Sequence, residues 1–284
     1  MSIKIVTDSA SDILPNEAKE MGISVIPLTL NWDGNDYKDA IDMDHEEFFK
    51  KLESSESIPV TSQVSPMTFI ESFGELLKDN DKLIMIALSS KLSGTYQSAC
   101  IAAEEYPGKV FVIDSLSATV GQRLLVIKAI NYLKEGLSIE ETVNNLKEDR
   151  YRIRIIAKLD TLKYLKKGGR ISATAAFAGE MLSIKPVITV TDGAIALVGK
   201  ARGSKNADNL LRKTIAEVGG VDFSNPCALV YSGLSDDQLQ QYIEGSRDIW
   251  QDKIDKFSIS TIGAVIGTHI GPGAIGAAFF ENIR

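Results

Sequence analysis

The first half of the chain alternates short apolar runs with amphipathic segments, and this alternation restricts the possible folds more than any other feature. The apolar runs have the length of buried strands and lie at residues 3–6, 23–30, 83–88 and 110–114. Buried strands that alternate with helices form parallel sheets with helices on both faces. We therefore expect an α/β fold with a three-layer α/β/α domain over residues 1–155, in which Pro27 places its strand at a sheet edge.

The second half has a different pattern, in which a hairpin signal replaces the regular alternation. Asp192-Gly193 separates two alternating apolar runs, which is typical of a two-residue β-hairpin. Further apolar runs predict strands at 153–158, 227–233 and 257–263, and a closing strand or helix at 274–280. Hairpins mixed with helices indicate a two-layer α+β domain with a mixed or antiparallel sheet. We place this domain at residues 156–284, with the boundary between residues 150 and 160.

Composition narrows the classes of function. The 284 residues carry a net charge of −7, which does not favour nucleic acid or an anionic membrane as a partner. No run of 18 apolar residues occurs, and residues 1–7 lack the long apolar core of a signal peptide. We therefore expect a cytoplasmic protein without stable membrane insertion. Cys100 and Cys227 stand in apolar surroundings, which favours buried thiols over a disulfide.

Three loops rich in hydroxyl groups stand where a doubly wound sheet binds its ligands, beyond the strand ends. They are TDSASD at 7–12, TSQVSP at 61–66 and SSKLSGT at 89–95. One interpretation is that their hydroxyls converge on an anion such as a carboxylate or phosphate. The other is that they cap helices, with Ser93 capping one helix and Ser11 or Asp12 capping another. A metal or acid–base role for Asp8 and Asp12 is less favoured, because Asp12 is well placed as a cap.

Catalytic and metal-binding residues are poorly represented. His45 lies in the first turn of a charged helix and is expected to be solvated, and His269 is expected on an exposed turn of a glycine-rich loop. A Ser93–His269 pair is conceivable, but no G-x-S-x-G elbow surrounds any serine. Two histidines and two distant cysteines give no cluster of metal ligands. We therefore expect neither a catalytic residue nor a metal.

Two further segments have an open meaning. GPGAIG at 271–276 matches a dinucleotide-binding pattern literally, but the acidic residue that should follow is absent, so a tight turn beside His269 is favoured. Lys166, Lys167 and Arg170 surround Gly168-Gly169, and a helix C-terminus explains them. The small residues at 173–179 that follow suit either close helix packing or the wall of a cavity.

Taken together, these motifs resemble the DegV family of fatty-acid-binding proteins. The matching segments follow one another along almost the whole chain: TDSASD at 7, TSQVSP at 61, SSKLSGTYQSA at 89, DTLKYLKKGGRIS at 160, IKP at 184 and IGTHIGPGAIG at 266. Any one of them is weak evidence, whereas the set is highly specific. Val64 stands where many members have proline, a change that we expect to alter only the loop.

The resemblance implies two α/β domains with a long-chain acyl group, such as palmitate, held in a tunnel at their junction. It implies that Thr61 and Ser93 bind the carboxylate and that His269 lies near the head group. Arg170 and Arg202 match basic positions that some members use near an acyl phosphate or a kinase partner. No cofactor is implied. The subtype that it indicates is the binding subunit of a fatty acid kinase.

Two classes of function follow from these residues. The favoured one is a binding protein that presents a fatty acid to a partner kinase or to lipid metabolism. Neutral hydroxyls and a helix N-terminus suit a carboxylate, because no full counter-charge then needs to be buried. The alternative is a serine-dependent acyl or phosphoryl transfer enzyme, with Ser93 as nucleophile and His269 as base. A scaffold with an empty cleft is a third possibility, and the sequence fixes neither acyl-chain length nor oligomeric state.

Overall fold

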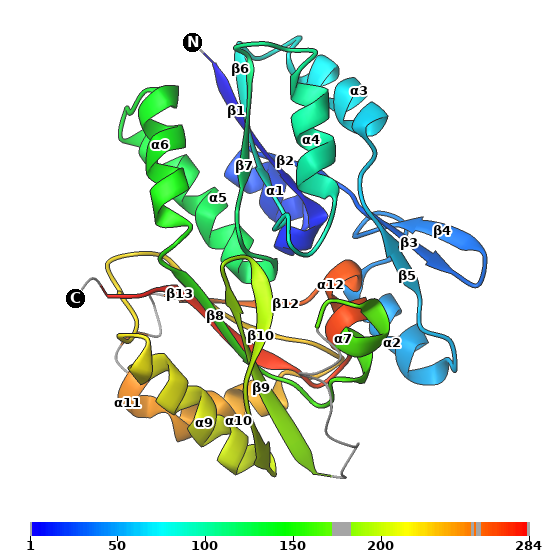
Figure 1. Cartoon of the computed structure of the whole chain (residues 1–284), viewed down its shortest axis with the longest axis vertical. Coiled ribbons are helices and arrows are strands. Elements are labelled where there is room, and N and C mark those ends of the chain that lie inside the picture. Colours follow the sequence, from blue (N-terminus) through cyan, green and yellow to red (C-terminus); the bar gives the residue numbers. More distant parts are fainter. Residues whose placement is uncertain (1, 172–182, 251–252, 254–256, 283–284) are drawn as a thin grey trace.

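A computed structural model describes residues 2–171, 183–250, 253 and 257–282. The small residues at 173–179, which suited a cavity wall or close packing, lie outside the described residues. Within the described ranges, no helix is both long enough and apolar enough to cross a bilayer. These described residues form two main sheets, one above the other in Figure 1, and a smaller third sheet at the side.

The first main sheet is the parallel sheet that the sequence predicts. Its strand order is β2-β1-β6-β7, and all neighbours are parallel. The strands are β1 (Ile3–Asp8), β2 (Ser24–Ile26), β6 (Lys82–Ala87) and β7 (Val110–Asp114). The helices that cover it are α1 (Pro15–Met21), α3 (Pro66–Leu76), α4 (Thr95–Ala103), α5 (Thr119–Lys134) and α6 (Ile139–Asp149).

Alternation along β6 shows how helices come to lie on both faces. Ile84 and Ile86 are buried in the cluster that contains α1, α5 and α6. Leu83 and Met85, one residue out of phase, are buried in the cluster that contains α3 and α4. Successive side chains of a strand point to opposite faces, so a strand that is apolar throughout needs cover on both. The expected three-layer arrangement is confirmed (Figure 1).

The third sheet was not predicted from the sequence. Its order is β4-β3-β5, and it is antiparallel. The elements of this region are β3 (Thr29–Trp32), β4 (Asn35–Lys38), β5 (Val60–Ser62) and α2 (His45–Ser54). The single strand expected over 23–30 is wrong, because the chain leaves the edge strand β2 just before Pro27, which has no N–H to donate to a ladder.

The second main sheet is mixed, as expected. Its order is β10-β9-β8-β13-β11-β12, and only the β11–β12 pair is parallel in the described chain. The strands are β8 (Ile153–Lys158), β9 (Ile184–Thr191), β10 (Ala194–Arg202), β11 (Cys227–Tyr231), β12 (Phe257–Thr261) and β13 (Ile275–Phe280). Asp192 and Gly193 both have positive φ and form the predicted hairpin turn. The closing segment is a strand, β13, in the interior of the sheet.

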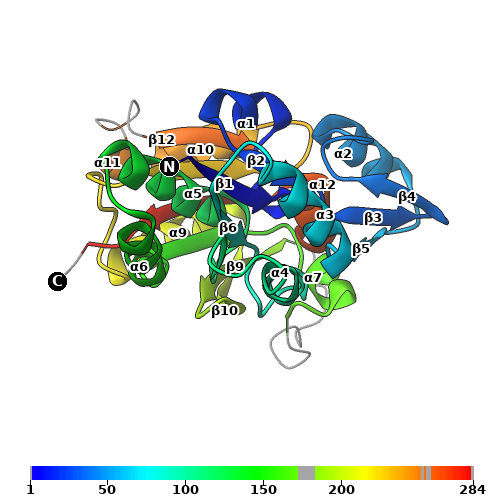
Figure 2. The ribbon, with the colours of Figure 1, turned by 90° about the horizontal axis from the view of Figure 1, so that it is seen from above.

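The two faces of the second sheet have different cover. One face packs on α9 (Ser204–Glu217), α10 (Asp237–Gly245) and α11 (Arg247–Trp250). The other face packs on α5, which therefore contacts both main sheets (Figure 2). Two short helices, α7 (Lys163–Gly168) and α12 (Ala264–Ile270), pack together near the third sheet. The second sheet begins with β8, and the division into domains after residue 155 stays a prediction.

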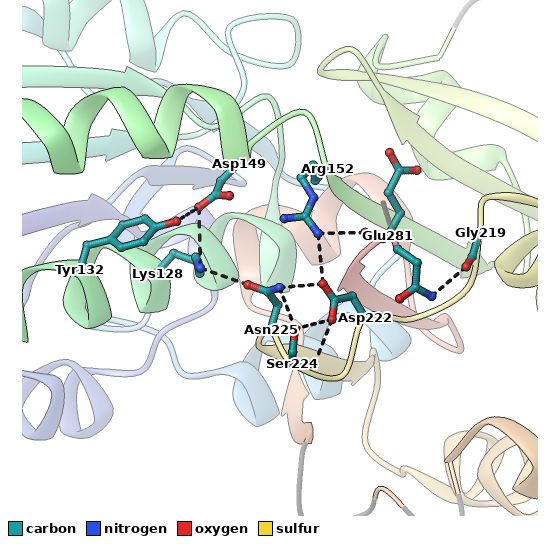
Figure 3. Close-up of polar contacts among 10 residues, drawn as sticks. Lys128, Tyr132, Asp149, Arg152, Gly219, Asp222, Ser224, Asn225 and Glu281 are labelled. Carbon is teal, nitrogen blue, oxygen red and sulfur yellow. Dashed lines mark hydrogen bonds and ion pairs between the residues drawn. The ribbon is translucent and has the colours of Figure 1, made fainter. Parts of the chain in front are cut away.

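A polar network also joins the two halves (Figure 3). Lys128 on α5 donates a hydrogen bond of 3.0 Å to the side chain of Asn225, and Asn225 donates one of 2.8 Å to Asp222. Arg152 donates to the Asp222 carboxylate over 3.1 Å and to the Glu281 carbonyl over 3.2 Å. These contacts fix α5 against the loops of the second sheet.

Candidate functional site

A cavity of about 210 Å³ lies between the two main sheets. Its walls are mostly apolar and come from both halves of the chain: Leu28, Leu88, Ala118, Ile155, Ala157, Ile188, Val190, Val230, Ile262, Val265 and Ala274. Few of these positions could be assigned to a cavity from sequence, since buried apolar residues of a core and of a cavity wall look the same in a strand pattern.

Four of the five residues that the family resemblance assigns to the site line this cavity. They are Thr61, Ser93, Arg170 and His269, and they come from β5, the loop before α4, the loop after α7, and α12. Ser62, Gln63, Gly94 and Thr119 also line it and were not singled out. The first two of these lie inside the TSQVSP motif, which was a usable signal, whereas Thr119 had none.

His269 lies against Thr61 at one end of the cavity. The Thr61 hydroxyl is 2.8 Å from His269 Nε2. The expectation of an exposed turn was wrong, because His269 is half-buried on α12. A side chain at Gly168 would bring a Cβ within 2.2 Å of His269 Nδ1, so α7 approaches the ring only because this residue is glycine. Burial, and secondarily the charge of Arg170, lower the pKa of His269 to about 4, so the ring is neutral at pH 7.

Ser93 stands just before α4 and is half-buried. Its hydroxyl is 2.9 Å from the Thr95 hydroxyl and accepts a hydrogen bond from the Thr95 N–H. The N-cap position itself is Gly94, so Ser93 binds the first helical residue without occupying the cap that the sequence suggested. A Cβ at Gly94 would lie 2.0 Å from the side-chain oxygen of Gln63, so glycine allows Gln63 to reach the start of this helix.

Arg170 completes the polar end. Its Nε donates to the carbonyl of Leu92 over 3.1 Å, and its Nη1 donates to the carbonyl of Gly168. These bonds hold the guanidinium between the Ser93 loop and the residue that packs on His269. Gly169 ends α7 with φ 71°, which confirms the helix C-terminus predicted here. We call Thr61, Ser93, Arg170 and His269 the head-group cluster.

Arg202 does not belong to this cluster. It is the last residue of β10, is exposed, and is not among the residues that line the cavity. Lys166 and Lys167 are also exposed, on α7 beside the head-group cluster.

The loop at 7–12 does not contribute a wall, contrary to the interpretation that all three hydroxyl-rich loops converge. The Thr7 hydroxyl donates to the carbonyl of Ile86 over 2.9 Å, and the Ser9 hydroxyl accepts from the N–H of Leu28 over 3.0 Å. Asp8 accepts from the N–H of Leu88 over 2.7 Å. These polar side chains are therefore hydrogen-bonded to backbone groups of neighbouring segments.

Asp12 is not the helix cap that the sequence suggested. The N-cap of α1 is Leu14, and Asp12 is buried with φ 53°. Its Oδ1 accepts a 2.9 Å hydrogen bond from the N–H of Gly263, the residue before α12. Asp39 accepts similarly from the N–H of Ala264, at 3.2 Å. Burial raises the pKa of Asp12 to about 8 and that of Asp39 to about 6.

His45 was expected to be solvated and is instead buried in the first turn of α2. A Cβ at Gly263 would lie 2.8 Å from both His45 Nε2 and Asp12 Oδ1, so the start of α12 fits tightly between these groups. Burial lowers the pKa of His45. His45 is buried, contrary to the expectation, because α12 packs against this end of α2.

The geometry favours holding a ligand over nucleophilic chemistry. His269 contacts Thr61 and Ser93 contacts Thr95, so the Ser93–His269 pair of the enzyme alternative is not formed. His269 Nδ1 is buried without a hydrogen-bond partner among the described residues, so no carboxylate there orients the ring as a base. The same part of the chain has no group of three side chains able to hold a metal ion.

The fold and the site together define a class: proteins in which two helix-covered sheets enclose an apolar cavity with polar side chains at one end. The family model described as "Uncharacterised protein, DegV family" matches residues 2–282, and the chain belongs to the DegV family. The chain is 41% identical over 282 residues to a DegV domain-containing protein of Caldanaerobacter subterraneus subsp. tengcongensis, with 99% of each covered. It is 37% identical over 285 residues to one of Clostridium acetobutylicum, again with 99% of each covered.

Solved structures of the family share the whole fold. A fatty-acid-binding DegV family protein from Thermus thermophilus superposes with a TM-score of 0.88 at 33% identity, covering 99% of this chain and 100% of that one. DegV of Bacillus subtilis, described as a fatty acid binding protein, gives 0.83 at 29% identity and the same coverage. A stearic-acid-binding protein from Eubacterium ventriosum gives 0.83 at 27%, with 98% of each chain covered.

Proposed function

We propose that this protein binds a long-chain fatty acid such as palmitate, with the acyl chain in the cavity and the carboxylate at the head-group cluster. The observation that carries the proposal is the polarity of the cavity, whose apolar walls end at Thr61, Ser93, Arg170 and His269. The fatty-acid binding described for structural relatives from Thermus thermophilus and Bacillus subtilis supports it.

The two parts of the ligand have different energetic roles. Burial of an acyl chain contributes about 0.8 kcal/mol per methylene, so about 15 methylenes contribute on the order of 10 kcal/mol before the costs of association. The hydroxyls of Thr61 and Ser93 then each contribute a hydrogen bond to a charged acceptor, about 1.5–3 kcal/mol. The neutral ring of His269 holds Thr61 in place, and Arg170 supplies the positive charge.

The finer proposal is that the bound acid is presented to a partner kinase in the cytoplasm, without a cofactor in the binding protein itself. Thr61 and Ser93 are half-buried and Ser62 is exposed, so the polar end of the cavity lies near the surface. The exposed Lys166 and Lys167 stand beside it, and the exposed Arg202 offers a further cation. Phosphorylation of the bound carboxylate would add negative charge there, and nearby cations would stabilise that charge.

Organic extraction of the protein purified from a bacterial host tests the binding proposal. We expect about one equivalent of long-chain fatty acid per chain, because release of a fully enclosed acyl chain is slow. Extraction of well-folded protein that yields no fatty acid, together with failure of the stripped protein to bind added palmitate or oleate, would show that the proposal is wrong.

A further inference from the structure

The two ring nitrogens of His269 have different surroundings. Nε2 lies 2.8 Å from the Thr61 hydroxyl. Nδ1 is buried and has no hydrogen-bond partner among the described residues. A neutral imidazole carries one proton, on either nitrogen, and the other nitrogen is then an acceptor. The position of this proton therefore decides whether Thr61 accepts a hydrogen bond from the ring or donates one to it.

Gly168 occupies the space next to Nδ1. It is the last residue of α7, which packs against α12 (Figure 1). A Cβ on Gly168 would lie 2.2 Å from Nδ1 and 2.9 Å from Cε1 of the ring. The glycine Cα is no more than one bond length further from Nδ1, so no water fits between them. A proton on Nδ1 would point at this Cα and would be a buried donor without an acceptor, which is costly.

Arg170 adds an electrostatic reason for the same arrangement. Its Nη1 donates to the carbonyl of Gly168, so the guanidinium is held beside the residue that contacts Nδ1. Its charge also contributes to the lowered pKa of His269. A nitrogen lone pair near a cation is favoured over an N–H dipole near it. Burial and charge together favour an unprotonated Nδ1 and a proton on Nε2.

A proton on Nε2 fixes the direction of the hydrogen bond to Thr61. The ring donates, the Thr61 oxygen accepts, and the hydroxyl proton of Thr61 remains for a ligand. Ser93 similarly accepts from the N–H of Thr95 over 3.3 Å, which leaves its own proton for a ligand, and an arginine has no acceptor atom. A carboxylate, which only accepts, suits this cluster. An alcohol brings a proton that finds no acceptor in it.

We propose that Gly168 is a positioning residue that holds His269 in the Nε2–H tautomer, so that Thr61 can only donate to the ligand. The site then selects head groups that only accept hydrogen bonds, an ionised carboxylate above all, and discriminates against long-chain alcohols. The inference rests on the proposed fatty-acid binding and adds to it the residue that orients the proton.

Nitrogen-15 NMR of the imidazole rings tests the tautomer directly. The chain has two histidines, so the signals that disappear in His45→Gln or in His269→Gln assign the spectrum. We expect His269 to carry its proton on Nε2 at pH 7, both in the stripped protein and with palmitate bound, because Gly168 and not the ligand imposes the tautomer. A proton on Nδ1 overturns the inference.

Gly168→Ala tests the positioning role. The φ of Gly168 is not positive, so alanine fits its backbone, but the added Cβ must displace the ring. We expect palmitate affinity to fall about tenfold to a hundredfold, as for Thr61→Val. In the Thr61→Val background, Gly168→Ala should cost less than about twofold, because both changes act through one hydrogen bond. Gly245→Ala is the matched control: Gly245 ends α10, and a Cβ there meets nothing within 4 Å, so affinity should not change.

Hexadecanol tests the selectivity for the head group. In competition against radiolabelled palmitate, it should bind at least about tenfold more weakly than unlabelled palmitate, because hydrogen bonds to a charged acceptor are stronger. The ratio of the two affinities should fall several-fold in Gly168→Ala and in Thr61→Val.

Equal binding of alcohol and acid, or a full effect of Gly168→Ala in the Thr61→Val background, overturns this inference while palmitate binding stands. Failure of palmitate to bind the wild-type protein overturns the proposed function instead, and the nitrogen-15 spectrum still reports the tautomer.

Discussion

The loops at 7–12 and 61–63 look alike in sequence, and the structure gives them opposite roles. Both carry hydroxyls beside a strand, yet Thr7, Ser9 and Asp8 bind backbone groups inside the protein. Thr61, by contrast, contacts His269 on the cavity wall. The difference lies in the strands, because β1 is an inner strand of the parallel sheet and β5 is a half-exposed edge of the small sheet.

The comparison shows that the surroundings of a hydroxyl decide its role. Around the loop at 7–12, the backbone N–H and C=O groups are shielded from water and need hydrogen-bond partners. The polar side chains of this loop supply those partners. At the edge strand, the backbone needs are met by β3 or by water, and a side chain remains available to a ligand. Substitutions should therefore affect stability in one loop and affinity in the other.

The largest effect is expected for Asp8→Ala in the inner loop. The change removes the acceptor for the N–H groups of Leu88 and Ala10 and leaves both buried. We expect a loss of about 3 kcal/mol in the free energy of unfolding, measured by chemical denaturation. Ser90→Ala, at an exposed serine near the same sheet edge, is the matched control and should change it by less than about 0.5 kcal/mol. Equal effects of the two variants would contradict the structural role of Asp8.

Thr61→Val and Ser93→Ala should give the opposite result. Each removes one hydrogen bond to the carboxylate, so palmitate affinity should fall about tenfold to a hundredfold. The melting temperature of the stripped protein should change little. Because both hydroxyls would bind one carboxylate, the double variant should deviate from additivity. A large loss of stability with unchanged affinity would give Ser93 a purely local role at the start of α4.

The third effect is a pH dependence that belongs to Asp12. In the unfolded chain this carboxyl has lost its proton by pH 6.5, whereas the folded chain keeps it until about pH 8. Raising the pH from 6.5 to 8 therefore favours the unfolded state, by about 1–2 kcal/mol in total. Asp12→Asn should flatten this decline in the free energy of unfolding. Asp8 and Asp39, with pKa values of about 6, act at lower pH, so an unchanged slope would contradict the assignment.

The smallest effect is expected at Arg202. This residue is exposed and does not line the cavity, so Arg202→Ala should change palmitate affinity by less than about twofold. Arg170→Ala is the variant to compare with it. Arg170 is anchored beside Ser93 and His269, so its removal should lower palmitate affinity about tenfold. Similar losses for both arginines would mean that the head-group cluster is larger than the cavity lining shows.

Much of this molecule follows from local sequence patterns. The alternation of apolar runs predicts the parallel sheet, and Asp192-Gly193 predicts the hairpin of the second sheet. The family motifs point to Thr61 and His269, which lie 208 residues apart and still come within 2.8 Å. These features were predictable because each depends on a short stretch of chain or on a motif of fixed composition.

The remainder depends on tertiary contacts that no local pattern contains. The stretch around His269 reads as a loop because of its glycines, yet it forms α12. A Cβ at Gly267 would come within 2.7 Å of Phe48, so this glycine permits close packing on α2. Asp12 is likewise a good cap by sequence, but the N–H of Gly263 takes its carboxylate. In both cases packing overrides the local preference.

Because Thr61 and His269 lie far apart in the sequence, the fraction of the protein that holds a ligand should report how much of the chain is correctly folded. A fragment that contains only one of the two segments cannot form their contact, so the unfolded chain should have no comparable affinity for the ligand. A ligand that binds only the native state stabilises it by about 4 kcal/mol at a thousandfold excess over its dissociation constant. The loaded protein should therefore resist proteolysis far better than the empty one, and a nick anywhere between the two segments that lets them separate should release the cargo.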